Sequence, residues 1–337
     1  MYNKSNVRYA SMDVIKAICA FFIVCIHTFM YIDTSSYFIT IIRFSVPVFF
    51  MITGYNYNSI KSKWSKYISN IVRLIFVSNL IYFLYELIRV IVNKDSIVVY
   101  INQIVSIKTI LKLVLFNESP FMWHLWYLFA ILYVLLIYRY VESKNIEKIL
   151  CFITPLLLIM DLILGKYSML IFGRYTNHMF LIRNFLFVGL PYFYIGVYMN
   201  IKEEKIRSIN INNKKIILLF LTSCITCICE RIILTGLGAN SPREHYISTT
   251  IMSIIIFIFV IRNKIFMEGT LLQKIGKEYS TWIYILHPLV ISIMNYILQE
   301  RNIINKYGLI YSMYIYFFTI ILIYIFKNFD KLKEYIS

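Results

Sequence analysis

Several histidines and charged residues lie inside long apolar stretches of this 337-residue chain, where an ionisable side chain usually faces a cavity or a partner. His27 ends the first stretch, fourteen residues after Asp13, and a helix would place it about 21 Å farther along the axis. Between them, Lys16, Ala20 and Val24 follow at three- and four-residue spacing, so one helix stripe joins all five. Because imidazole titrates near neutral pH, His27 is a candidate general base or nucleophile.

Other polar residues recur near the ends of the later apolar stretches. Arg43 and Glu230 are expected at a depth close to that of His27. His287 is expected to lie lower, because only about 10 Å of helix separates it from the presumed inner start of its stretch at Ser280. The remaining members of this set are His124, Trp126, Arg183, Asn184 and Arg231.

Each of these residues also has a structural interpretation. A histidine in a membrane helix can bridge two helices by hydrogen bonds, and arginines can extend to the outer interface. Glu86 and Arg89, one turn apart, are expected to form a structural ion pair. Asp161 is expected to pack between helices or to pair with a residue that the sequence does not identify.

The composition indicates which elements hold these residues. Hydrophobic residues make up 60% of the chain and charged residues only 15%, which is too apolar for a water-soluble globule of this length. The long apolar runs with few glycines and prolines favour helices that cross a bilayer. The predicted spans are residues 14–32, 38–58, 71–92, 121–140, 149–165, 180–200, 214–234, 246–262, 280–298 and 307–326.

The charge pattern predicts the topology. Most Lys and Arg residues fall in connections on one side if the N-terminus is inside, so the net charge of +17 reflects membrane orientation rather than nucleic-acid binding. We therefore predict one all-α domain over residues 1–337, a bundle of about ten transmembrane helices in the cell membrane with both termini cytoplasmic. All six cysteines lie in apolar runs without paired ligand spacing, so we expect neither disulfides nor a metal site. The oligomeric state stays open.

The longest connection, residues 93–120, contains a predicted amphipathic helix. Residues 104–116 place Lys108 and Lys112 on one polar side of that helix. We expect it to lie on the outer membrane surface, with its apolar side in the lipid bilayer.

Five segments, in chain order, resemble the motifs of membrane acyltransferase family 3. They are RYASMDVIKAICAFFIVCIH from Arg8, RFSVPVFFMITGY from Arg43, WHLWYL from Trp123, RNFLFVGLPYFYIG from Arg183 and YSTWIYILHPLV from Tyr279. Thr53 stands where many members have Ser. The resemblance implies a ten-helix domain that moves an acyl group from acyl-CoA to a sugar or similar acceptor. The third and fourth segments are also similar to the membrane domain of the vancomycin-resistance serine racemases.

The family resemblance implies a set of catalytic residues. His27 would remove the proton of an acceptor hydroxyl or carry the acyl group itself, and Arg43 or Arg183 would stabilise the oxyanion. Glu230 would orient His27 or hydrogen-bond the acceptor. No bound cofactor is expected, because the acyl donor, acetyl-CoA in the simplest case, is a co-substrate.

The resemblance also implies donor and acceptor sites. Residues expected near the cytoplasmic acyl-CoA entrance are Arg8, Asp13, Lys16, Lys61 and Lys63, with Asp13 pairing with Arg8 or Lys16 because it lies too far from His27. Residues expected to bind the acceptor, a hydroxyl of an extracytoplasmic or lipid-linked glycan, are His124, Trp126, Arg183, Asn184, Arg231 and His287. The alternative is an amino-acid binding or transport module, in which Arg43 or Arg183 grips a carboxylate.

Overall fold

The computed structural model is helical and describes residues 9–29, 37–176, 179–241, 245–298 and 308–336, with no strand in those ranges. Seven helical segments in the described ranges are long and apolar enough to cross a membrane. They are α1 (Ala10–Phe29), α2 with α3 (Tyr37–Ile42 and Ser45–Tyr55), α5 (Trp64–Val92), η1 with α8 (Trp123–Leu125 and Trp126–Ser143), α13 (Asn213–Gly236), α16 (Ser280–Leu298) and α18 (Gly308–Ile336). The predicted all-α membrane fold is confirmed.

Shorter apolar helices stand at the other three predicted spans. They are α9 (Ile149–Leu164), the continuous pair η3 and α11 (Phe185–Gly189 and Leu190–Ile201), and α14 (Ile247–Arg262). Two further helices, α6 (Ile97–Ile104) and α7 (Ile107–Phe116), form a bent pair that is long and apolar enough to cross a membrane only if the two are counted as one span. The number of ten spans and the cytoplasmic placement of both termini therefore stay predictions.

The chain forms two compact units. Unit 1 comprises residues 1–49, 203–234 and 246–337, and unit 2 comprises residues 50–202 and 235–245. Besides the spans, unit 1 contains α12 (Glu203–Ser208) and α15 (Leu271–Glu278), and unit 2 contains α4 (Tyr57–Ser62), α10 (Ser168–Phe172) and η2 (Met179–Leu181). The expectation of a single domain over residues 1–337 stays a prediction.

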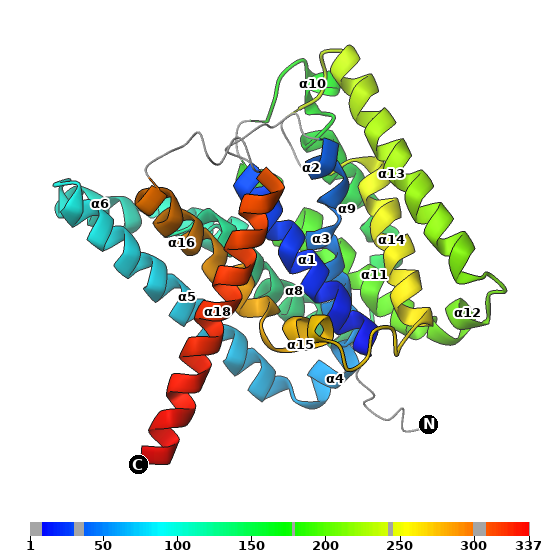
Figure 1. Cartoon of the computed structure of the whole chain (residues 1–337). Helices are drawn as coiled ribbons and strands as arrows, with labels where there is room; N and C mark the ends of the chain where they lie inside the picture. Colours follow the sequence, from blue (N-terminus) through cyan, green and yellow to red (C-terminus); the bar gives the residue numbers. More distant parts are fainter. Residues whose placement is uncertain (1–8, 30–36, 177–178, 242–244, 299–307, 337) are drawn as a thin grey trace. The chain divides into compact units, whose positions relative to one another are not determined.

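Helix α1 forms the centre of unit 1, where it packs against α15, α16 and α18 (Figure 1). The hydroxyl of Tyr316 on α18 donates a hydrogen bond to the carbonyl oxygen of Ala17, 3.0 Å away. Farther along α1, the hydroxyls of Thr28 and Ser312 lie 2.6 Å apart. Because both contacts satisfy buried polar groups, they fix α18 along the length of α1.

Two glycines bring α3 and α11 into backbone contact in unit 2. A Cβ at Gly54 would overlap with the carbonyl oxygen of Phe193, and a Cβ at Gly196 would overlap with that of Met51. Small residues of this kind let membrane helices approach closely without a hydrophobic driving force. The glycine of the second motif and the last glycine of the fourth therefore position the same helix pair.

Candidate active site

The rings of His27 and His287 meet edge to face within unit 1, with centroids 4.7 Å apart and planes at 62°. His27 lies in the last turn of α1 and is partly buried, whereas His287 lies on α16 and is fully buried. Nδ1 of His287 is 2.9 Å from the carbonyl oxygen of Ile283. Since that oxygen only accepts hydrogen bonds, Nδ1 carries the proton and Nε2 is the basic nitrogen of the neutral ring.

The expectation that His287 lies lower than His27 is wrong, because the two rings are in contact. That expectation counted the rise along one helix from Ser280, and such a count does not give the position of α16 beside α1. Nearby, Gly276 of α15 packs on the backbone of α1, where a Cβ would overlap with the carbonyl oxygen of Asp13.

Arg43 lies in a break between α2 and α3 in unit 1. The hydroxyl of Ser45 donates to the carbonyl oxygen of Ile42 across the break, at 2.7 Å. The ring of the next residue, Phe44, packs edge to face on Phe22 of α1, with centroids 5.9 Å apart. The break thus places Arg43 on a segment that packs against α1, while its expected meeting with His27 stays a prediction.

Glu230 and Arg231, neighbours on α13, each hold another helix of unit 1. The carboxylate of Glu230 accepts hydrogen bonds from the backbone N–H groups of Ile247 and Ser248, at 2.8 and 3.1 Å. It also accepts the Ser248 hydroxyl at 2.6 Å, and so caps the positive end of α14. Arg231 donates to the hydroxyl of Thr40 on α2 at 2.8 Å. These contacts are structural, and the predicted catalytic and acceptor-binding roles of the two residues stay predictions.

The third predicted motif forms a polar and aromatic cluster in unit 2. His124 is buried, with its ring edge to face against Tyr82 at a centroid distance of 5.0 Å. The guanidinium of Arg183 lies 4.9 Å from the centroid of the Trp123 ring, a cation–π contact. Trp123 is 42% exposed, so this arginine lies at an accessible aromatic face.

Asn184 and Asn117 hold the start of the fourth motif. The side-chain oxygen of Asn184 accepts from the backbone N–H groups of Leu186 and Phe187, at 2.9 and 2.8 Å. Asn117, fully buried, donates to the carbonyl oxygen of Trp126 at 3.0 Å and accepts the N–H of Phe185 at 2.8 Å. Sequence reasoning missed Asn117, whose only local signal is its place just after an amphipathic helix, where asparagine ends helices well.

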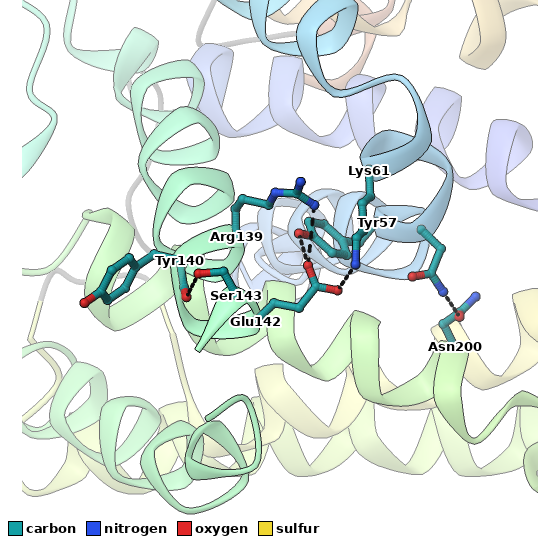
Figure 2. A network of polar contacts seen from close by, with 8 residues as sticks. Tyr57, Lys61, Arg139, Tyr140, Glu142, Ser143 and Asn200 are labelled. Carbon is teal, nitrogen blue, oxygen red and sulfur yellow. Dashed lines mark hydrogen bonds and ion pairs between the residues drawn. The ribbon is translucent and has the colours of Figure 1, made fainter. Parts of the chain in front are cut away.

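One of the predicted cytoplasmic cations, Lys61, belongs to a polar network of unit 2 (Figure 2). Its centre is Glu142, which accepts hydrogen bonds from the Tyr57 hydroxyl at 2.8 Å and from Lys61 Nζ at 2.6 Å. Burial and the neighbouring Glu142 raise the pKa of Tyr57, so its hydroxyl remains a donor. Lys61 is 44% exposed, and Lys63 lies exposed where α4 meets α5.

In unit 1, Lys16 Nζ lies 3.3 Å from Asp13 Oδ1, which confirms the expected pairing of Asp13 with a neighbouring cation on α1. Arg8 lies outside the described residues. Lys16 belongs to unit 1, and Lys61 and Lys63 belong to unit 2. A shared role of these residues toward acyl-CoA stays a prediction.

A buried acid–imidazole pair in unit 2 was not identified from the sequence. Nδ1 of His245 lies 2.8 Å from Oδ2 of Asp161, and both side chains are buried. The ring of Tyr192 packs edge to face on His245 at 6.1 Å. Asp161 thus finds its partner 84 residues away along the chain.

Comparison with known proteins places this arrangement in a family. An amino-acid racemase of Enterococcus faecalis is 24% identical over an alignment of 314 residues, which covers 84% of this chain and 41% of that protein. The chain therefore spans less than half the length of this relative. No solved structure matches the chain significantly. A family model described as an acyltransferase domain matches residues 9–329, nearly the whole chain and four of the five motifs in full. This chain belongs to membrane acyltransferase family 3.

Proposed function

We propose that this chain is a membrane acyltransferase that moves an acyl group, acetyl in the simplest case, from cytoplasmic acyl-CoA to a hydroxyl of an extracytoplasmic or lipid-linked glycan. The observation that carries the proposal is the 4.7 Å pairing of His27 with His287 inside the family's domain. Such a pair offers a basic nitrogen and a positioning group at one place, as general base catalysis requires. The protein would act in the cell membrane with both termini cytoplasmic.

In the proposed reaction, His27 removes the proton of the acceptor hydroxyl while the oxygen attacks the thioester carbonyl. The tetrahedral intermediate carries its negative charge near Arg43, which stabilises it. Its collapse breaks the carbon–sulfur bond, and the CoA thiolate takes the proton from the His27 imidazolium. In the alternative mechanism, His27 is the nucleophile: its ring first accepts the acyl group from the thioester and then passes it to the hydroxyl.

His287 is a positioning residue in this mechanism. Its Nδ1–H is held by the Ile283 carbonyl oxygen, so its ring has one orientation and presents one surface to His27. A fixed neighbouring ring restricts the rotation of His27 and so preorganises the base. The other residues that we propose to bind the acceptor are His124, Trp126, Arg183, Asn184 and Arg231.

The proposed donor path uses cations to attract the phosphates of acyl-CoA. Asp13 and Lys16 stand on the stripe of α1 that leads to His27, and Arg8 precedes them in the sequence. Lys63 is an exposed cation that supplies further positive charge, and Lys61, which pairs with Glu142, is 44% exposed and lies close to it in the sequence. Their contribution would be the capture of the donor and not the chemical step.

A second candidate function is amino-acid binding or transport. It is favoured by the relative named an amino-acid racemase, whose whole length this chain does not cover. In this alternative, Arg183, whose guanidinium lies against Trp123, would hold a carboxylate.

One experiment separates the two functions. Purified protein in lipid vesicles is incubated with labelled acetyl-CoA and a cell-envelope extract, and parallel vesicles are given labelled serine. We expect acyl incorporation that His27→Ala abolishes, with the same membrane insertion and thermal unfolding as the wild type. Serine uptake without acyl incorporation, or full transfer by His27→Ala, would overturn the proposed mechanism.

A further inference from the structure

An open groove of about 520 Å³ lies along the bent helix pair α6 and α7 of unit 2. Polar residues line most of it, from α6 across the bend into α7, together with Val99. The polar residues are Asn102, Gln103, Ser106, Lys108, Thr109 and Lys112. The proposed acyl transfer uses none of them.

The groove owes its shape to hydrogen bonds at the bend. The axes of α6 and α7 differ by 41°, and Ser106 stands between them. Its hydroxyl oxygen accepts the N–H of Thr109 at 3.2 Å and so caps α7. The Thr109 hydroxyl donates in turn to the carbonyl oxygen of Gln103 at 2.8 Å. The polar wall is therefore held by its own local contacts.

The groove carries positive charge. Lys112 is neutralised in part, since its Nζ lies 3.0 Å from Glu118 Oε1 and 5.0 Å from the centroid of the Phe180 ring. Lys108 makes no ion pair or hydrogen bond with any residue of the described ranges. The amide side chains of Asn102 and Gln103 stand beside it as hydrogen-bond donors. This combination suits an oxyanion with several acceptor oxygens.

The other faces of the two helices are apolar and exposed among the described residues. Val98, Val105, Ile107 and Val114 are 68%, 59%, 76% and 57% exposed. A continuous apolar surface of this kind in a membrane protein is covered by lipid acyl chains. The polar groove thus borders an acyl-chain surface, and headgroup phosphates lie at that border in a bilayer.

We propose that this groove binds the phosphate of an anionic phospholipid headgroup, with the acyl chains of that lipid on the neighbouring apolar faces. Lys108 supplies the charge, and Asn102 and Gln103 donate hydrogen bonds to the phosphate oxygens. A zwitterionic headgroup fits less well, because its own cation would approach Lys108. The site is independent of the acyl-transfer chemistry.

Native mass spectrometry of the purified full chain tests this site, with phosphatidylglycerol and phosphatidylcholine as probes. We expect retention of phosphatidylglycerol over phosphatidylcholine, and about a fivefold loss of that retention for Lys108→Gln. Lys108→Arg keeps the charge and should bind as the wild type does. Lys94→Gln removes an exposed cation from the segment before α6 and is the matched control, with no change expected.

Three results would overturn the proposal. The first is equal retention of the two lipids by the wild type. The second is an equal loss in Lys108→Gln and Lys94→Gln, because general attraction to the membrane surface would then explain binding. The third is displacement of phosphatidylglycerol by glycerol 3-phosphate at equal concentration, because the groove would then take its phosphate from solution. Circular dichroism of each variant is the check that its helices are kept.

Discussion

His245 and Asp161 form a buried pair in unit 2, with Nδ1 of the imidazole 2.8 Å from Oδ2 of the carboxylate. The pair joins the end of α9 to the segment that precedes α14. Lys166 holds the same segment, since its Nζ donates to the carbonyl oxygen of Ser241 at 2.8 Å. Polar contacts with α9 and with the residue Lys166 thus hold the segment before α14 in place.

The first prediction concerns the coupling of this pair. Asp161→Ala and His245→Ala should each lower the free energy of unfolding by about 1–3 kcal/mol, because each removes the hydrogen bond between the two buried side chains. The double variant should lose less than the sum of the two, since the second substitution removes a group that has already lost this hydrogen bond. The free energy of unfolding in detergent is measured for the wild type, the two single variants and the double variant. If the losses of the two single variants add up to that of the double variant, the two residues do not pair directly.

A second prediction follows from the contact of Gly276 with Asp13. Gly276→Ala should lower the free energy of unfolding by about 1–3 kcal/mol, because the added methyl group forces α15 away from α1. Acyl transfer should fall as well, since α16 and His287 follow directly from α15. Gly236→Ala, on α13, is the control, because its methyl group would meet no atom within 4 Å. Equal stability of the two variants would show that α15 does not touch α1 there.

The third prediction is a dependence of stability on alkaline pH. Burial and the neighbouring Glu142 raise the pKa of Tyr57 above its ordinary value of 10.0, so the folded protein holds this proton more tightly than the unfolded chain does. This contribution is fully present below pH 10 and is lost as the pH rises through the higher folded pKa. Chemical unfolding between pH 8 and about 11 should show a steeper loss for the wild type than for Tyr57→Phe. If the free energy of unfolding falls with pH equally in the wild type and in Tyr57→Phe, Tyr57 does not cause this loss of stability.

Local patterns in the sequence predicted the helices and the contacts within one helix. Long apolar runs indicated the spanning segments, because a bilayer requires them. The pairing of Glu86 with Arg89, one turn apart, is confirmed at 2.7 Å. The pairing of Asp13 with Lys16 rests on the same spacing. In each case, helical geometry alone brings the two side chains together.

Contacts between helices could not be predicted in this way. The meeting of His287 with His27 depends on how α16 packs against α1, which the length of helix from Ser280 does not give. The break at Arg43 interrupts an apolar run whose composition continues across it. The partner of Asp161 is a histidine in a polar loop far along the chain. Such relationships follow from packing of distant segments, which a local pattern does not encode.

The last prediction separates the roles of His27 and His287. His287→Gln should lower kcat for acyl transfer by about a hundredfold, because His27 loses the ring that fixes its orientation. The KM for acyl-CoA should stay within about twofold, since a positioning residue acts on the base and not on the donor. His27→Ala should abolish transfer under the same conditions.

The pH profile distinguishes positioning from simple packing. With His27 as the base, kcat/KM should rise with pH in both the wild type and His287→Gln, and the variant should reach a lower plateau because its base is less well oriented. Tyr296→Phe, an exposed position on the same helix, is the control and should leave rate and profile unchanged. An unaltered profile in His287→Gln together with full activity would mean that the ring contact does not serve the reaction, and His27 would then be held by other groups of α1 and its neighbours.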